Sequence, residues 1–283
     1  MTTRRAFLEN TACTFLCTLA LPDLALQDPP PAPRKLGDIG LQLFTVRNEL
    51  RQDFEGTLAR VSAIGYKEVE FAGYFGRTPA EIKAALTRFG LSAPGAHLPA
   101  TALPYGWERA LEAAAAIGHR YLICPSLMPD ERRNLDDYKR TAAQFNRAGE
   151  MTKKAGIQFA YHNHAFEFAP LDGQLPYDVL LAETDPSLVK MEMDLYWITR
   201  SNQDPLKYFE RYPGRFALLH VKDMDDTPRR GQTEVGRGII DFKRIFAQAD
   251  RAGTKHFFVE HDEPVSAFDS IQISYAHLKQ LEF

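Results

Sequence analysis

The chain has 283 residues, 45% of them hydrophobic and 25% charged, which is the composition of a globular protein rather than a disordered one. Its 34 lysines and arginines are outnumbered by 37 aspartates and glutamates, so the formal net charge is −3. A protein that binds nucleic acid usually carries a basic excess, and we expect no nucleic-acid partner here. After residue 27, no uninterrupted apolar run approaches the roughly 20 residues that a membrane-spanning helix needs.

The first 27 residues have the pattern of an export signal. Arg4 and Arg5 precede the apolar stretch 12–26, and a proline-rich segment follows at 28–36. A basic start, an apolar middle and a proline-rich exit are typical of exported precursors, and the paired arginines resemble a twin-arginine signal. The alternative is an amphipathic N-terminal helix, but the segment lacks a polar stripe of helical period and ends in prolines.

This pattern predicts a signal peptide at 1–27, a linker at 28–36 and a mature domain at 37–283 that is periplasmic or secreted. Removal of the signal leaves Cys124 as the one cysteine, so the mature protein would have no internal disulfide bond. No membrane span would remain. The sequence leaves open whether the mature chain forms a homo-oligomer.

The mature part alternates short apolar runs with longer helical patterns. Eight such alternations without a break in composition predict an α/β fold, a single closed (β/α)8 TIM barrel. A doubly wound sheet is the alternative, but the expected Gly-x-Gly-x-x-Gly after the first strand is absent. The predicted strands are 39–46, 66–71, 91–97, 120–124, 157–162, 188–194, 216–221 and 256–260. The predicted helices include 53–64, 79–89, 107–117, 135–154, 177–182, 205–211 and 241–252.

Polar residues stand at the ends of these apolar runs, where a buried strand usually avoids them. In a parallel barrel the C-terminal strand ends gather at one mouth, so we expect these side chains to meet there. Burying several of them costs several kcal/mol per unpaired charge, which a metal ion would offset. Separate helix caps and surface salt bridges are the alternative. The residues are Gln42, Glu70, His97, His162, His164, Glu167, Glu192, Asp194, His220, Lys222 and Glu260.

Four of these residues are the predicted metal ligands, namely Glu167, Asp194, His220 and Glu260. Three carboxylates and one imidazole form an oxygen-rich donor set. Such a set suits Mn²⁺, Mg²⁺ or Co²⁺ better than a closed structural zinc site, with Zn²⁺ as the remaining alternative.

Motifs spread from about residue 39 to the C-terminus resemble the sugar phosphate isomerase/epimerase family of xylose isomerase-like TIM barrels. The resemblance implies a divalent-metal site built from a Glu, an Asp, a His and a second Glu. Asp194, His220 and Glu260 match the last three. Many relatives place the first Glu within the fifth strand, so His162 or His164 is the alternative to Glu167. The motifs are 40-GLQLFTVR-47, 161-YHNHAFEF-168, 194-DLYW-197, 220-HVKD-223, 235-VGRGIIDF-242 and 259-VE-260.

The resemblance also implies a chemistry, the removal of a proton next to a sugar carbonyl. That reaction needs a base and a positive charge for the developing enolate oxygen. In epimerase-type relatives, two metal-bound glutamates act on opposite faces of the substrate, and Glu167 and Glu260 are the candidates here. Lys222, His162 and His164 are predicted to donate protons or stabilise oxygen. The predicted substrate contacts are Gln42, Glu70, His97, Trp197 and Arg237.

Three functions fit this pattern. The first is a divalent-metal-dependent isomerase or epimerase that acts on a carbohydrate through an enediolate. The second is a lyase or dehydratase that acts on keto-sugars or 3-keto-glycosides, in which the same enolate undergoes β-elimination. The third, a noncatalytic carbohydrate-binding barrel, would leave the predicted metal ligands without a role. In each case the partner is a small sugar or keto-sugar.

Overall fold

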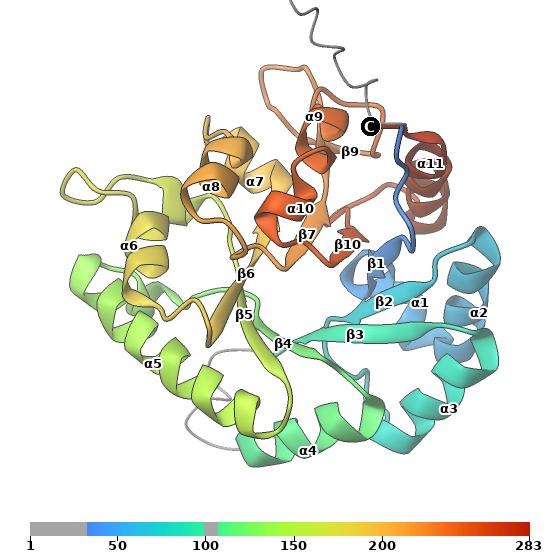
Figure 1. Cartoon of the computed structure of the whole chain (residues 1–283). Helices are drawn as coiled ribbons and strands as arrows, with labels where there is room; N and C mark the ends of the chain where they lie inside the picture. Colours follow the sequence, from blue (N-terminus) through green and yellow to red (C-terminus); the bar gives the residue numbers. More distant parts are fainter. Residues whose placement is uncertain (1–32, 99–106) are drawn as a thin grey trace, which may run out of the picture. The chain divides into compact units, whose positions relative to one another are not determined.

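A computed structural model of the chain describes residues 33–98 and 107–283, and the predicted export signal lies outside them. Eight parallel strands close into a barrel in the order β1-β10-β7-β6-β5-β4-β3-β2. Helices cover the outside of this ring (Figure 1). The prediction of a single parallel (β/α)8 barrel is confirmed.

The barrel strands are short, and all eight lie within the predicted apolar runs. All except β1 begin and end within two residues of the predicted bounds. The eight strands are β1 (Gly40–Gln42), β2 (Glu68–Phe71), β3 (Ser92–His97), β4 (Tyr121–Cys124), β5 (Gln158–His162), β6 (Val189–Asp194), β7 (Leu218–Val221) and β10 (His256–Val259). Two further strands, β8 (Asp223–Met224) and β9 (Gln232–Thr233), form a hairpin after β7.

The helices between the strands begin at residues whose side chains cap them. Asp53 accepts a hydrogen bond from the backbone of α2, and Thr78 and Glu81 form a reciprocal capping box at α3. The helices are α1 (Arg47–Gln52), α2 (Phe54–Ile64), α3 (Pro79–Phe89), α4 (Trp107–Ile117), α5 (Leu135–Lys154), α6 (Pro176–Glu183), α7 (Leu195–Arg200), α8 (Pro205–Arg211), α9 (Phe242–Phe246), α10 (Ala249–Ala252) and α11 (Ala267–Gln280). None of these described helices has the length and apolarity that a membrane span requires.

Two predicted elements differ from the structure. The predicted strand 39–46 ends at Gln42, because the Gln42 side chain accepts a hydrogen bond from the Phe44 backbone (3.0 Å) and starts a 3-10 helix. The predicted helix 241–252 is broken into α9 and α10. The predicted linker is described from residue 33, and Arg34 exchanges two backbone hydrogen bonds with Phe283.

Side chains alternate along each strand between the barrel interior and the helix layer. A small cluster that includes Ile123, Ala160, Leu218 and Phe258 is separate from the main core between strands and helices. Leu218 stands two residues before His220 on the same strand face, so this cluster lies in the interior, next to the polar strand ends. The interior is therefore apolar in the middle and polar at one mouth.

Candidate active site

A pocket opens at the C-terminal ends of the barrel strands. Its volume is about 370 Å³, and its walls combine carboxylates, imidazoles and one ammonium group. This mouth is where the active sites of such barrels lie, which makes the pocket the candidate active site. It is lined by Phe44, His97, Pro125, Ser126, His162, His164, Lys222, Glu260 and Asp262.

Strand β6 delivers two carboxylates to the barrel interior. Because side chains alternate along a strand, Glu192 and Asp194 share its inward face, and both are fully buried. Asp194 also caps α7, since its Oδ1 accepts hydrogen bonds from the backbone N–H groups of Tyr196 (2.9 Å) and Trp197 (3.0 Å). Its Oδ2 has no well-aligned hydrogen bond among the described residues. The helix cap therefore fixes the carboxylate and leaves Oδ2 facing Lys222 Nζ, 3.0 Å away.

Strands β1 and β2 add a second buried polar pair. Gln42 Nε2 donates a hydrogen bond to Glu70 Oε2 (2.6 Å), and both side chains are fully buried. Gly95 on β3 makes room for this carboxylate, because a Cβ there would lie 2.7 Å from Glu70 Oε1. Gln42 and Glu70 were predicted as substrate contacts; in the structure both are fully buried, and neither is among the residues that line the pocket.

Three imidazoles pack against the buried carboxylates Glu70 and Glu192. His97 Nε2 lies 2.7 Å from Glu192 Oε2 and 3.1 Å from Glu70 Oε2. His220 Nε2 lies 2.8 Å from Glu70 Oε2 and 3.2 Å from Glu192 Oε2. His162 Nδ1 lies 3.2 Å from Glu192 Oε2. The two glutamates thus hold all three rings from the interior side.

The second nitrogen of two of these rings faces the other carboxylates of the site. His220 Nδ1 lies 2.7 Å from Glu260 Oε2, and His162 Nε2 lies 3.7 Å from Asp194 Oδ2. The rings of His162 and His220 are in contact, with centroids 4.5 Å apart. Each of the two imidazoles therefore bridges two carboxylates.

Lys222 is the one lysine in the pocket lining, and it is surrounded by carboxylates. Its Nζ lies 3.0 Å from Asp194 Oδ2, 2.8 Å from Glu260 Oε2 and 2.9 Å from Asp262 Oδ1. Asp262 is itself held by Gln232 of β9, whose Nε2 donates to Asp262 Oδ2 (2.5 Å). Only 2% of Lys222 is exposed, so the ammonium group is a built-in cation of the site.

Electrostatics divide the site into charged and neutral groups. Burial opposes the charge on His97, but Glu70 and Glu192 outweigh it and raise the pKa of this imidazole to about 9. The pKa of Lys222 is likewise raised well above its usual value, because Asp194 and Glu260 outweigh the effect of burial. The pKa of Glu260 is held well below its usual value, since Lys222 and His220 overcome the opposing effect of burial.

His220 also favours its charged form, because Glu192 and Glu260 outweigh burial and raise its pKa well above the usual value. Three other side chains shift toward their neutral forms. Burial lowers the pKa of His162 well below its usual value, and neighbouring His220 lowers it further. Burial and Lys222 lower the pKa of His164 to about 4, so both imidazoles of the His162-Asn163-His164 motif are neutral at pH 7. Burial raises the pKa of Asp194 to about 6, partly offset by Lys222.

Glu167, a predicted ligand and base, lies outside this cluster. Its Oε1 accepts a hydrogen bond from the phenol of Tyr161, and its Oε2 accepts one from the backbone N–H of His164 (2.9 Å). Tyr161 packs against Phe145 of α5, on the helix side of β5, whereas the next residue, His162, faces the interior. The structure therefore does not bring Glu167 to the predicted metal position, because Glu167 lies in the 3-10 helix Phe166–Phe168 after β5, where Tyr161 and the His164 backbone hold its carboxylate.

Two predicted substrate contacts also stand apart from the pocket lining. Arg237 is largely exposed and pairs with Glu234 (3.2 Å) in the loop after β9. Trp197 is half-buried on α7, with its ring centroid 5.7 Å from that of His164. His97, by contrast, lines the pocket as predicted.

The loop that carries Arg237 is fixed by Asp223. The Asp223 carboxylate accepts hydrogen bonds from the backbone N–H groups of Gly236 (2.9 Å), Gly238 (3.0 Å) and Ile240 (3.1 Å). Gly236 has a positive φ of 91°, a conformation that other residues rarely adopt. The glycine-rich motif therefore folds around one buried carboxylate.

Two groups of described residues place potential metal donors within 4.8 Å of one another. One group is His97, His162, Glu192 and His220; the other is Asp194, His220 and Glu260. Buried atoms without a well-aligned hydrogen bond include Glu70 Oε1, Glu192 Oε1, Asp194 Oδ2 and His220 Nδ1. Two of these atoms face charged neighbours, Asp194 Oδ2 at Lys222 and His220 Nδ1 at Glu260, and the donor set as a whole fits a divalent ion.

Glu192 was expected at the barrel mouth but was given no role, and Asp262 was not predicted as a site residue. Glu192 is two residues before Asp194 on the same strand, and this period-two spacing alone places both on the inward face. Asp262 follows the last strand by three residues, and no local pattern distinguishes it from a surface loop residue. Its contact with Lys222 depends on the closed barrel.

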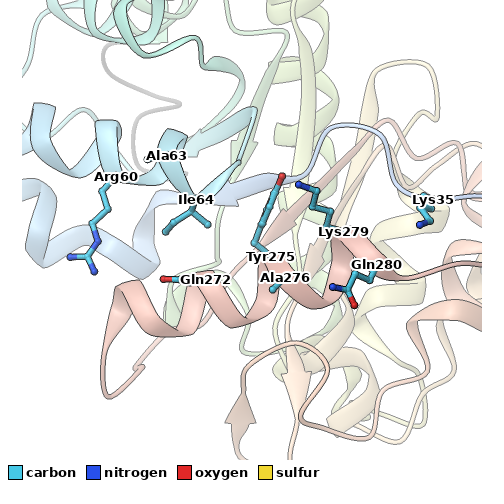
Figure 2. Close-up of a pocket in the computed structure, with 9 residues that line it drawn as sticks. All are labelled: Lys35, Arg60, Ala63, Ile64, Gln272, Tyr275, Ala276, Lys279 and Gln280. Carbon is cyan, nitrogen blue, oxygen red and sulfur yellow. The ribbon is translucent and has the colours of Figure 1, made fainter.

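A second pocket, of about 730 Å³, lies on the outside of the barrel between α2 and α11 (Figure 2). Arg60, Ala63 and Ile64 line one side, and residues of α11 that include Tyr275 and Lys279 line the other. The described lining contains cations and apolar groups but no carboxylate or imidazole. It therefore lacks the donors for a metal ion and the bases for proton transfer.

Comparisons with known proteins agree with this geometry. Residues 58–281 match the family described as the xylose isomerase-like TIM barrel. An inosose dehydratase from Lacticaseibacillus casei is 26% identical over 236 residues, covering 71% of this chain and 78% of that protein. A sugar phosphate isomerase/epimerase from Parabacteroides distasonis is 30% identical, with a TM-score of 0.76, covering 89% of this chain and 96% of its own.

A more distant likeness extends only to the fold. The IolI protein, whose crystal structure contains a zinc atom, is 12% identical, with a TM-score of 0.67, covering 85% of this chain and 96% of its own. Relatives of this chain are enzymes, both isomerase/epimerases and dehydratases. The chain belongs to the family of xylose isomerase-like TIM barrels.

Proposed function

We propose that the protein is a divalent-metal-dependent lyase that abstracts a proton next to the carbonyl of a neutral keto-carbohydrate and eliminates a β-hydroxyl group. The observation that carries this proposal is that Glu260 lies in the pocket wall while Glu167 is held behind β5. An epimerase that protonates the opposite face would use a second carboxylate there. The two carboxylates in the pocket lining, Glu260 and Asp262, both follow β10 and both contact the ammonium group of Lys222.

The residues of the chain can carry out both proton transfers. Glu260 is ionised at neutral pH, because Lys222 and His220 hold its pKa low, and it is placed to accept the proton from carbon. The electron pair of that C–H bond forms the enolate and then the new C=C bond as the β-oxygen leaves. Lys222, 2.8 Å from Glu260, is placed to give that oxygen a proton, so water is released.

A divalent ion would be held by residues of the two donor groups, which share His220. When bound, such an ion supplies the positive charge that stabilises a developing enolate oxygen. Phe44, which is 37% exposed, offers an apolar face at the rim of the pocket for a sugar ring. The neutral imidazole of His164 lines the same pocket and can orient a hydroxyl group.

The name of the Lacticaseibacillus casei relative favours dehydration of a cyclic keto-polyol. The Parabacteroides distasonis neighbour favours the second candidate, isomerisation or epimerisation through the same enolate. A phosphorylated substrate fits poorly, because Lys222 is already surrounded by three carboxylates. We therefore propose a substrate without a phosphate group.

The test is incubation of the metal-loaded protein with inososes, ketoses and 3-keto-glycosides in D₂O, followed by NMR. Loss of water or of the aglycone supports the lyase. Deuterium incorporation with an intact carbon skeleton supports the isomerase or epimerase instead. Sugar binding without either reaction would contradict an enzymatic role for this pocket.

We also propose that the protein is exported, on the basis of Arg4, Arg5 and the apolar stretch that follows them. Replacing both arginines with lysine should leave an unprocessed precursor in the cytoplasm. Normal processing of that double variant would contradict transport by the twin-arginine route.

A further inference from the structure

We propose that His162 completes the metal site as a ligand through Nε2, together with Asp194, His220 Nδ1 and Glu260, and that Glu192 and Glu70 act as positioning residues behind the two imidazoles. This inference rests on the proposed function, since it specifies how that site holds its ion. It replaces Glu167 in the predicted ligand set with a side chain that the structure does bring to the cluster.

The orientation of the two imidazoles is the first argument. His162 directs Nδ1 at Glu192 (3.2 Å) and Nε2 at Asp194 (3.7 Å). His220 directs Nε2 at Glu70 (2.8 Å) and Nδ1 at Glu260 (2.7 Å). In each ring, one nitrogen faces a fully buried carboxylate and the other faces a carboxylate of the second group.

A neutral imidazole has one N–H donor and one lone pair. If the proton lies on the nitrogen that faces Glu192 or Glu70, the other nitrogen points its lone pair at the oxygens of Asp194 or Glu260. Without an ion, Lys222 Nζ contacts Asp194 Oδ2 (3.0 Å) and Glu260 Oε2 (2.8 Å), and His220 Nδ1 can donate to Glu260 (2.7 Å). With an ion bound, the lone pairs of both rings and these two oxygens would point at it. A carboxylate that accepts the N–H of a metal-bound histidine is the usual arrangement in metal sites, because it fixes the tautomer and the ring orientation.

His97 has a different role, although it belongs to the first donor group. Its Nε2 lies between two carboxylate oxygens, Glu192 Oε2 at 2.7 Å and Glu70 Oε2 at 3.1 Å. An atom in that position serves as a hydrogen-bond donor to both. His97 therefore ties the two positioning glutamates together and is not expected to bind the ion.

The carboxylate of Asp194 is also held in place by contacts outside the proposed metal position. Asp194 uses Oδ1 to cap α7, and its Oδ2 faces Lys222 Nζ (3.0 Å), so Oδ2 is the oxygen that an ion would share with this lysine. Two imidazole nitrogens and two carboxylate oxygens form a set that suits Zn²⁺, Co²⁺, Fe²⁺ or Mn²⁺, whereas Mg²⁺ favours oxygen ligands. We expect a transition ion to displace Mg²⁺ from this site.

The first experiment measures Co²⁺ affinity and visible absorption of the full-length protein, with thermal unfolding of the metal-free form as the folding check. His162→Ala should weaken Co²⁺ binding by more than the ~10- to 100-fold typical of lost outer partners, and Glu192→Gln should fall within that range. The matched control is His164→Ala, a neighbouring imidazole in the same pocket wall, which should bind Co²⁺ as the unaltered protein does. Glu167→Gln should also bind normally.

The second experiment identifies the ligating nitrogens in the Zn²⁺-loaded protein by ¹⁵N NMR of the histidine side chains. We expect opposite tautomers, with the proton on Nδ1 of His162 and on Nε2 of His220. The same tautomer in both rings, or a loss of affinity in His97→Ala as large as that in His162→Ala, would overturn the assignment.

The outcomes also separate this inference from the proposed function. If His162→Ala keeps its Co²⁺ affinity but loses turnover, His162 acts on the substrate, and the ligand assignment fails while the proposed reaction stands. If the unaltered protein turns over substrate without a bound ion, the metal-dependent reaction itself fails.

Discussion

Tyr161 and Glu167 form a buried hydrogen bond on the helix side of β5, so these two residues of the motif 161-YHNHAFEF-168 lie on the side of the strand opposite to His162. His162 faces the barrel interior, and Glu167 is fixed behind it. Burial raises the pKa of Glu167 to about 7, against the opposing effect of the Tyr161 hydroxyl. The carboxylate holds the loop after β5 through Tyr161 and the backbone of His164.

The first prediction concerns this hydrogen bond. Tyr161→Phe should lower the free energy of unfolding by ~1–3 kcal/mol, because Glu167 loses the partner of one buried oxygen. Metal content should remain that of the unaltered protein. Chemical denaturation and elemental analysis measure the two quantities. Loss of metal without loss of stability would place Glu167 back in the metal site.

The second prediction compares Glu260 and Glu167, which the sequence analysis both assigns as metal ligand and base. Glu260→Gln removes the base in the pocket wall and should lower kcat by roughly 10²- to 10⁴-fold, with the fold intact. Glu167→Gln should lower kcat by less than about 10-fold, since its carboxylate does not line the pocket. Steady-state kinetics with the substrate found by NMR gives both values. Equal losses would indicate a two-carboxylate reaction.

The fold could be predicted from the sequence because barrel strands and their helices have strong local signals. Buried strands are short apolar runs, and the boundaries of α3, α4, α5 and α8 coincide with the predicted ones. The break between α9 and α10 has no clear signal in the helical pattern of 241–252. It became visible only in the structure.

The site was predicted less completely, because its contacts join strands far apart in sequence. Asp194, His220 and Glu260 end strands that local patterns identify, and the structure brings them together. Glu167 was misplaced because the motif does not show on which side of β5 a residue beyond the strand will lie. The contacts of His97 with Glu70 and Glu192 depend on how different strands are aligned with one another in the closed barrel. The contact of Asp262 with Lys222 depends on this alignment too.

The third prediction concerns the loop after β9. Asp223→Ala leaves the backbone N–H groups of Gly236, Gly238 and Ile240 without their acceptor, so the loop should lose its fixed conformation. We expect faster proteolysis within 232–241 and a free energy of unfolding lower by ~1–3 kcal/mol or more. Asp225→Ala, which removes a carboxylate on the neighbouring exposed turn, is the matched control. Identical proteolysis of the two variants would refute this role.

The fourth prediction is a pH effect on stability at His119. This ring is buried, lies 2.7 Å from the Ala93 carbonyl through Nδ1 and stacks on Tyr74. Burial lowers its pKa below the usual 6.5, so the folded protein favours the neutral ring. The stability contributed by neutral His119 is therefore present above about pH 6.5 and is lost as the pH falls toward the folded-state pKa.

His119→Gln keeps a donor for Ala93 but cannot be protonated in this range. Its free energy of unfolding should fall less between pH 7.5 and pH 5 than that of the unaltered protein, in denaturation at both values. A variant with the same pH dependence would show that His119 does not titrate as described.

The last prediction concerns Lys222, which supplies the positive charge among Asp194, Glu260 and Asp262. Lys222→Met keeps most of the side-chain volume but leaves three carboxylates without their cation. Removing one partner of a buried ion pair typically costs about 3–5 kcal/mol, so the metal-free variant should unfold at a markedly lower temperature.

A bound divalent ion would replace part of the missing charge, and a ligand that binds only the folded state raises its stability. The rise in Tm on adding Co²⁺ should therefore be larger for Lys222→Met than for the unaltered protein. Lys35→Met, at an exposed lysine that pairs with Glu282, should behave as the unaltered protein does. If metal-free Lys222→Met melts at the unaltered temperature, the ammonium group does not balance these carboxylates, and its assignment as the proton donor loses its electrostatic basis.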